Sequence, residues 1–317
     1  MSLLSPAPKP LPGPLSPLSD LDWFSKIKLI VFDLDGTLLK SPNETPGERL
    51  LKLGRSKYLN DARITVATGR TFAGAKSVLN AFGESGHTPV VLYNGSVVLQ
   101  PENKRLIAHR TISREICHEI VNFGERAKAQ VFVYQFLDLS DTPEFEQLEW
   151  SKFERVSYFG QSDVPAFEFN GMPVSRGMLP FDRPATAILI LATDEAERIE
   201  LLRVLSNVTE VSVTSSGGKY IELRPSGSSK AVGMNDLAHS IGLSSDEVLA
   251  VGDNDNDVEL LEWAGVGVSV KGASNLALQA STFVTRFGAE RGAIEVLDLV
   301  RRAKRLNPIR TKNERKR

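Results

Sequence analysis

The stretch from Ile27 to Thr37, which reads IKLIVFDLDGT, decides the fold. Its first six residues form an apolar run of β-branched and aromatic residues with one lysine, which is typical of a buried parallel strand. The run ends at Asp33, and a second carboxylate follows at Asp35. Gly36 permits a sharp turn because it has no Cβ. The stretch predicts two carboxylates just beyond a strand end, although an acidic turn that caps the next segment also fits the bare pattern.

Two carboxylates in this position suit phosphoryl chemistry. Mg²⁺ prefers oxygen ligands at about 2.1 Å and keeps several of its waters. A carboxylate beside a bound Mg²⁺ and a phosphate can attack phosphorus and form an aspartyl-phosphate. The stretch is therefore compatible with a Mg²⁺ site at which a carboxylate attacks a phosphate.

On either side of this stretch, expected strands alternate with expected helices. Further strands are expected at 64–67, 90–93, 248–251 and 266–270, and helices at 71–82, 230–241 and 258–263. This alternation predicts an α/β fold with a doubly wound parallel sheet. Polar residues follow four of the strands: Asp33, Thr68, Asn94 and Asp253. Because ligands bind at the carboxyl ends of strands in open α/β sheets, we expect these four residues to converge on one crevice.

The rest of the chain departs from this pattern. The length of 317 residues suggests two domains. Residues 110–220 have an α+β pattern and are predicted to form an inserted domain, with residues 26–109 and 221–300 as the catalytic core. The proline-rich residues 1–25 are predicted to be a disordered tail. Residues 301–317 are predicted to be a basic tail, and a solvated end is favoured there over contact with RNA or lipid.

A second acidic cluster runs from Gly252 to Asp257 and contains Asp253 and Asn256. It can supply a further metal carboxylate at the same crevice. A calcium loop beginning at Asp253 would need a glycine at its sixth position and a glutamate at its twelfth, and the sequence has neither. A plain helix start is the alternative, because Asp and Asn favour helix N-termini.

Two weaker motifs also carry polar groups. Thr68 and Gly69 precede an expected helix whose free amides favour anions, although an ordinary helix cap fits equally well. Lys230 begins another expected helix, where a cation can neutralise phosphoryl charge. The single cysteine, Cys117, is expected to be a small buried residue rather than a nucleophile.

The composition excludes several classes of protein. The formal net charge is -1, which gives no reason to expect nucleic acid as a partner. No segment approaches the roughly 20 apolar residues of a membrane helix, so we expect no membrane association. One cysteine allows no internal disulfide, which is compatible with a reducing, cytoplasmic location.

Taken in order, these motifs resemble those of the haloacid dehalogenase superfamily of phosphohydrolases, and more narrowly its Cof-type sugar-phosphatase branch. The motifs are Asp33-Leu34-Asp35-Gly36-Thr37, then Thr68-Gly69-Arg70, then Lys230, then Gly252-Asp253 with Asn256-Asp257. Asn94-Gly95 also matches a pair found in this branch. The long interval between Thr68 and Lys230 corresponds to the place where this branch inserts its cap domain, here 110–220.

The resemblance implies a role for each matching residue. Asp33 attacks phosphorus, and Asp35 protonates the leaving oxygen and then activates water. The metal is bound by Asp33, by the main-chain carbonyl of Asp35 and by Asp253, with Asp257 in support. Phosphate or substrate is bound by Gly36, Thr68, Gly69, Lys230, Asn256 and Asn94.

These roles predict a Mg²⁺-dependent phosphatase that acts on a small phosphorylated metabolite, such as a sugar phosphate. A phosphotransferase or mutase that uses the same aspartate is the first alternative. A catalytically idle binding module is the second. We expect substrate choice to depend on the inserted domain, most of all on residues 138–177, because the motif residues address only the phosphoryl group and the metal.

Overall fold

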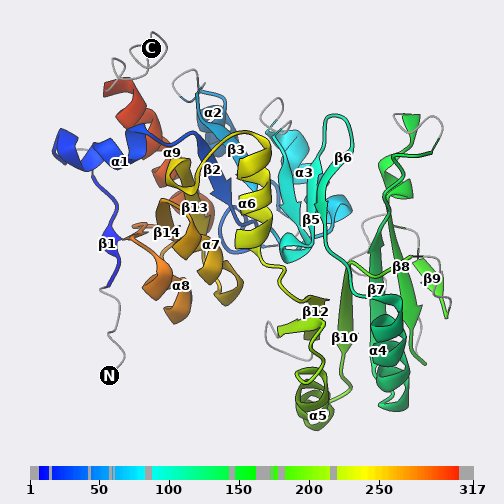
Figure 1. Ribbon diagram of the computed structural model, residues 1–317. Helices are drawn as coiled ribbons and strands as arrows, with labels where there is room; N and C mark the ends of the chain where they lie inside the picture. Colours follow the sequence, from blue (N-terminus) through cyan, green and yellow to red (C-terminus); the bar gives the residue numbers. More distant parts are fainter. Residues whose placement is uncertain are drawn as a thin grey trace. The chain divides into compact units, whose positions relative to one another are not determined.

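The computed structural model describes residues 7–13, 16–41, 44–56, 59, 61–82, 88–142, 147–161, 172, 174–177, 183–214 and 220–306. The chain divides into two compact units (Figure 1). The first unit comprises Met1–Thr68, Ser77–Val90 and Met234–Arg317, and the second comprises Gly69–Lys76 and Val91–Gly233. The division passes through helices α3 (Phe72–Ala81) and α6 (Lys230–Ser240).

The first unit is built on a six-stranded sheet in the order β1-β15-β14-β13-β2-β3. All neighbouring strands in this sheet run parallel. The strands are β1 (Lys9–Pro10), β2 (Leu29–Phe32), β3 (Arg63–Val66), β13 (Val248–Gly252), β14 (Val266–Ser269) and β15 (Phe283–Val284). The helices are α1 (Asp22–Ser25), α2 (Glu48–Gly54), α7 (Val258–Trp263), α8 (Asn275–Ala280) and α9 (Ala289–Leu306). Every residue of β2, β13 and β14 is buried, which explains their unbroken apolar sequences.

The order of the strands creates a switch point between β2 and β13. The chain moves outward in one direction from β2 through α2 to β3, and in the other direction from β13 through α7 to β14. Because such crossovers are right-handed, α2 and α7 cover opposite faces of the sheet. This is the doubly wound parallel sheet predicted from the sequence. The crevice beyond the strand ends at such a switch point is where ligands bind in this class of fold.

The second unit contains a second six-stranded sheet in the order β11-β12-β10-β7-β8-β9. Its strands are β7 (Gln130–Phe136), β8 (Glu154–Phe159), β9 (Val174–Arg176), β10 (Ala187–Leu191), β11 (Val211–Thr214) and β12 (Tyr220–Pro225). Helices α4 (Arg114–Arg126) and α5 (Glu195–Leu205) pack with these strands in one apolar core. Cys117 belongs to that core, and burial raises the pKa of its thiol to about 12. The prediction that Cys117 is a buried core residue is confirmed.

A smaller sheet, β4-β5-β6, corrects the placement of one predicted strand. It comprises β4 (Val90–Leu92), β5 (Val97–Gln100) and β6 (Arg105–His109), whereas residues 90–93 were expected in the parallel sheet. The residue before β4 is Pro89, which has no amide hydrogen to donate to a neighbouring strand. Its carbonyl instead accepts a hydrogen bond from the side-chain hydroxyl of Thr65 on β3.

The prediction of a disordered tail over residues 1–25 is wrong for the part of that segment that the structure describes. Strand β1 pairs with β15, and the backbone of Leu11 continues this pairing by donating to Val284 over 3.1 Å. Leu11, Leu21 and Phe24 are all at most 2% exposed. The prolines therefore suit an edge strand, where an unpaired nitrogen costs nothing, and the sparse apolar residues between them supply the buried contacts.

The prediction of a basic tail over residues 301–317 is also wrong in part. Helix α9 continues to Leu306, and Ala303 is fully buried within it. Lys304 donates to Asp61 over 2.8 Å, so its charge is paired within the first unit. Residues 307–317 lie outside the described residues. Within the part of the chain that is described, no helix combines the length and the apolar composition needed to cross a bilayer.

Candidate functional site

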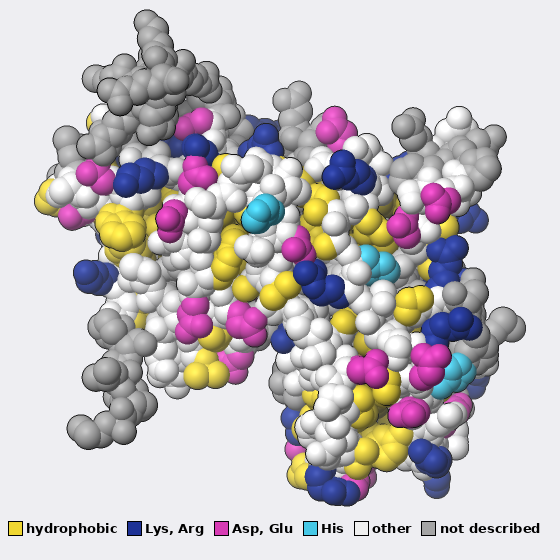
Figure 2. Space-filling view, in the orientation of Figure 1, with side chains coloured by type: hydrophobic (Ala, Val, Ile, Leu, Met, Phe, Trp, Pro, Cys, Tyr) yellow, Lys and Arg dark blue, Asp and Glu magenta, His cyan; other side chains and the backbone are white. Residues whose placement is uncertain are grey.

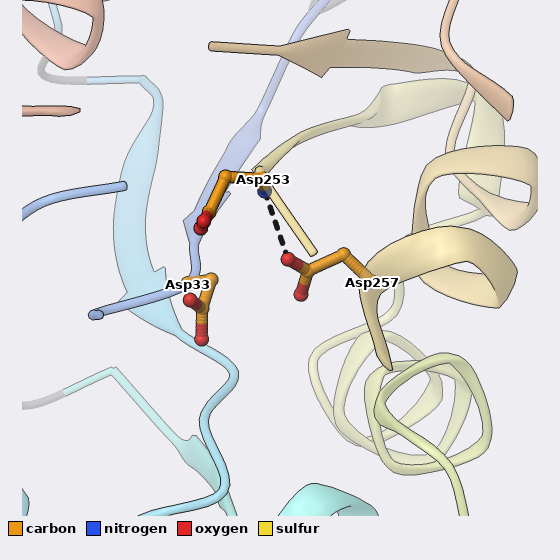
Figure 3. Close-up of side chains that lie close together, drawn as sticks. All are labelled: Asp33, Asp253 and Asp257. Carbon is orange, nitrogen blue, oxygen red and sulfur yellow. Dashed lines mark hydrogen bonds between the residues drawn. The ribbon is translucent and has the colours of Figure 1, made fainter. Parts of the chain in front are cut away.

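Three carboxylates converge in the first unit. One oxygen from each of Asp33, Asp253 and Asp257 lies within 4.8 Å of the other two. Figure 3 shows the three side chains pointing toward a common space. Asp33 is 5% exposed and Asp257 is fully buried, so their charges have little access to solvent. Close, poorly hydrated carboxylates repel one another, and the arrangement therefore favours a cation between them.

The switch point of the parallel sheet places the first two of these residues. Asp33 directly follows β2, and Asp253 directly follows the neighbouring strand β13. The amide of Asp33 donates to the carbonyl of Val251 over 2.9 Å, which extends the ladder by one residue into the site. Asp33 and Asp253 are thus held by backbone pairing at adjacent strand ends, as the sequence led us to expect.

The third carboxylate is positioned by a turn that begins a helix. Asp257 ends the short 3-10 helix η8 (Asp255–Asp257), and α7 follows. Its Oδ2 accepts hydrogen bonds from the amides of Asp253 (2.9 Å) and Asn254 (3.1 Å). Gly252 permits this close turn, because a Cβ there would lie 2.6 Å from the Cβ of Asp257. Asp257 therefore both contributes charge and fixes the backbone that carries Asp253.

Residues of the first motif complete the packing around Asp253. Thr37 is fully buried and its hydroxyl donates to Oδ1 of Asp253 over 2.7 Å. Gly36 has a φ of 87°, and a Cβ at this position would overlap the carboxylate of Asp253. Only glycine combines this backbone conformation with this closeness. The Asp-Gly-Thr part of the motif is thus explained by contact with the second acidic cluster.

Three further predicted residues belong to the first unit. Asp35 forms an isolated β-bridge with Leu39, and its side chain is half-buried and lies outside the three-carboxylate group. Thr68, which is 1% exposed, comes two residues after β3, the neighbour of β2. Asn256 lies within η8.

Gly69, Asn94 and Lys230 belong to the second unit. A Cβ on Gly69 would lie 2.9 Å from Nδ2 of Asn94, so these two predicted residues are in direct contact. Gly95 packs against the carbonyl of Ser229, the residue before Lys230. Asn94 and Lys230 are 2% and 1% exposed. The second unit thus brings Gly69, the Asn94 turn and the start of α6 together.

Sequence reasoning missed several residues that hold these groups in place. Thr37 was part of the quoted motif, and a hydroxyl one residue after a turn glycine was a usable signal. Glu154, Glu222 and Tyr93 gave no local signal, because their partners are distant in sequence. Residues 143–146 and 162–171, which are part of the segment 138–177 expected to govern substrate choice, lie outside the described residues.

Comparison with known proteins gives one family. The model for haloacid dehalogenase-like hydrolases matches residues 30–297, which span every motif described above. A curated relative from Bacillus subtilis, 5-amino-6-(5-phospho-D-ribitylamino)uracil phosphatase YitU, is 27% identical over 283 residues. The match covers 86% of this chain and 97% of that protein.

Solved structures share the fold. A haloacid dehalogenase-like hydrolase from Bacteroides thetaiotaomicron superposes with a TM-score of 0.71 at 22% identity, covering 86% of this chain and 98% of that one. A sugar phosphatase of subclass IIB of the same superfamily superposes with a TM-score of 0.66 at 18% identity, covering 86% of this chain and 98% of that one. The chain thus shares its fold with these two solved structures, one of which is a subclass IIB sugar phosphatase.

Proposed function

Because the chain belongs to the haloacid dehalogenase-like hydrolases and is a phosphatase, we propose that it hydrolyses a small phosphorylated sugar or polyol, with Mg²⁺ as its cofactor and Asp33 as its nucleophile. The observation that carries the proposal is the group of three carboxylates within 4.8 Å at the switch point of the sheet. Asp33 and Asp257 are buried. A hydroxyl donates to Asp253, and two backbone amides donate to Asp257.

The donor set suits a hard divalent cation. Carboxylate oxygens from Asp33 and Asp253 and the main-chain carbonyl of Asp35 would hold Mg²⁺, with Asp257 supporting Asp253. Such a partial set leaves positions for water and for substrate oxygen, which is the usual coordination of Mg²⁺ in proteins. When bound, Mg²⁺ would offset the negative charges and polarise the phosphoryl group.

In the proposed reaction, Asp33 attacks phosphorus and the bond from phosphorus to the substrate oxygen breaks. Asp35 gives its proton to that oxygen, and then takes a proton from the water that hydrolyses the aspartyl-phosphate. We expect Thr68 and Lys230 to hold phosphoryl oxygens, and Gly36, Gly69, Asn94 and Asn256 to bind phosphate or substrate, as the resemblance implies. The partial exposure of Asp35 supports its role, because a group that exchanges protons with a leaving group and water needs access to both.

The inserted segment 110–220 is proposed to act as the cap that contacts the leaving group. The name of the Bacillus subtilis relative describes a phosphorylated ribityl chain on a heterocycle, and one structural neighbour is described as a sugar phosphatase. These names support a phosphorylated sugar or polyol as the substrate class. On the face seen in Figure 2, acidic and basic side chains are interspersed, which also favours a small substrate over a polyanion.

Phosphate release from p-nitrophenyl phosphate and from a panel of sugar and polyol phosphates tests the proposal. We expect turnover that requires Mg²⁺ and is lost with excess chelator. Asp33→Asn should abolish turnover, whereas Asp255→Asn, an exposed acid in the same acidic cluster, should retain it. Full activity of folded Asp33→Asn, or full activity in chelator, would contradict the proposal.

A further inference from the structure

A buried carboxylate in the second unit has no part in the proposed reaction. Glu154 begins β8 and is 2% exposed. Its Oε1 accepts hydrogen bonds from the amide of Phe72 (2.6 Å) and the hydroxyl of Tyr93 (2.7 Å). Its Oε2 accepts from the amide of Ala73 over 2.7 Å. Three donors from two separate segments thus meet one side chain.

The first segment is the start of α3. Phe72 and Ala73 are the first two residues of this helix, and their amides have no partner within it. A negative charge at this end also interacts favourably with the helix dipole. Only Thr71 separates the helix from Thr68-Gly69-Arg70, so Glu154 fixes the end of that loop. The indole of Trp150 packs on the ring of Phe72 with centroids 4.0 Å apart, which adds an apolar contact to the same junction.

The second segment is a strained turn. Tyr93 and Asn94 both have a φ of 50°, and Gly95 follows with 96°. Non-glycine residues adopt this left-handed region rarely and at an energetic cost, and two in succession need outside support. Glu154 holds the Tyr93 hydroxyl, and Glu222 accepts from Nδ2 of Asn94 over 2.7 Å. The support for the turn therefore comes from two strands of the second sheet, β8 and β12.

The two segments are also bonded to each other. The amide of Tyr93 donates to the carbonyl of Arg70 over 3.1 Å, and Gly69 contacts Asn94. A shift of either segment would therefore move the other. Both carry residues proposed to bind phosphate or substrate.

From this geometry we propose that Glu154 is a positioning residue, which holds the Thr68-Gly69-Arg70 loop and the Asn94 turn in the arrangement that binds the phosphoryl group. The inference rests on the proposed function of that loop and turn. Glu154 itself does not touch the substrate. It comes from the segment proposed as the cap, so the phosphate-binding loop depends on a side chain of that segment.

The test compares three variants of the whole protein. Glu154→Gln keeps the size of the side chain but turns an NH₂ group toward donors, so at least one hydrogen bond is lost. Tyr93→Phe removes a single hydroxyl and leaves intact both hydrogen bonds from the backbone amides of Phe72 and Ala73 to Glu154. Ser157→Ala, at a buried position of the same strand, is the matched control.

The readout is the Kd of inorganic phosphate in the presence of Mg²⁺, measured by calorimetry, beside KM and kcat for p-nitrophenyl phosphate. We expect Glu154→Gln to weaken phosphate binding roughly tenfold, which corresponds to about 1.4 kcal/mol. Tyr93→Phe should weaken it about threefold by the same relation, and Ser157→Ala should leave it unchanged. A purely structural role would lower Tm without changing the Kd of phosphate in folded protein.

An unchanged Kd in folded Glu154→Gln would overturn the inference. If that variant does not fold, an unchanged Kd in folded Tyr93→Phe overturns it instead. Failure of the proposed function would look different: the wild type would bind phosphate with no turnover of any ester, or Asp33→Asn would stay active. Because phosphate binding is measured without turnover, the two failures are distinguishable.

Discussion

The pH dependence of stability gives a prediction that can be worked through from one side chain. His109 ends β6, and its Nε2 lies 3.0 Å from the hydroxyl of Thr186. That hydroxyl already accepts from the amide of Phe136 over 2.8 Å, so its proton is available to the imidazole. This arrangement fits a neutral ring. Burial lowers the pKa of His109 from 6.5 to about 4, although the nearby Asp138 acts in the opposite direction.

The size and sign of the effect follow from this shift. A lowered pKa means that the folded state favours the neutral ring, so the contribution to stability is present above pH 6.5 and is lost as the pH falls from 6.5 to about 4. Each pKa unit is worth about 1.4 kcal/mol, so the total loss through this one group is about 3 kcal/mol. Replacement with glutamine removes the titration and keeps a polar atom near Thr186.

The assay is urea unfolding of the wild type and of His109→Gln across this pH range. We expect the stability of the wild type, relative to the variant, to fall by about 3 kcal/mol between neutral pH and about pH 4. His239→Gln, which changes an exposed histidine, is the control for histidine replacement itself. If wild type and His109→Gln lose stability in parallel, the account of a buried neutral imidazole is refuted.

Three further predictions concern the first unit. Gly36→Ala should abolish phosphatase activity, because a Cβ there would overlap the Asp253 carboxylate. The control Gly242→Ala, at a φ of 71° with open space around it, should lower the free energy of unfolding by about 1 kcal/mol and leave activity unchanged. Phosphate-release assays and urea unfolding of both variants test this, and activity in Gly36→Ala would count against the described packing. Thr37→Val removes the hydrogen bond to the Asp253 carboxylate, which is worth about 1.5 kcal/mol, and should raise the Mg²⁺ concentration for half-maximal activity about tenfold. A Mg²⁺ titration of turnover that matches the wild type would contradict this prediction. Deletion of residues 1–13 should lower the free energy of unfolding by about 2 kcal/mol, because the buried Leu11 side chain is lost. Deletion of residues 1–8 keeps Leu11 and should not lower it. Equal stability of the two truncated proteins in urea would show that β1 contributes nothing to stability.

The sequence was most informative where adjacent strands end. Asp33 and Asp253 are far apart in the chain, yet each directly follows an apolar run, and parallel strands bring such ends to one edge of a sheet. Their convergence could therefore be predicted without any knowledge of pairing. The strand at Val90 misled the same reasoning, because an apolar run does not reveal which sheet it joins, and Pro89 prevents an ordinary ladder contact.

Two other features could not be predicted for different reasons. The structure of the N-terminal segment could not be predicted from its composition. The prolines of residues 1–25 are typical of disorder, but one buried side chain such as Leu11 is enough to hold an edge strand in place. The turn at Tyr93 and Asn94 is supported by residues that are distant in sequence. Glu154 is 61 positions from Tyr93, and Glu222 is 128 positions from Asn94. No local pattern distinguishes such a buried carboxylate from a solvated one.

The central claim is that Asp33 carries the phosphoryl group during turnover, and trapping that group tests the claim most directly. p-Nitrophenolate leaves without needing a proton, so Asp35→Asn should still form the aspartyl-phosphate but hydrolyse it slowly. After acid quenching and borohydride reduction, which converts an aspartyl-phosphate to homoserine, fragmentation of the tryptic peptide spanning residues 29–40 locates the modified residue. We predict modification at Asp33 in Asp35→Asn and none in Asp33→Asn. Modification at another residue, or turnover by a folded Asp33→Asn protein, would contradict it.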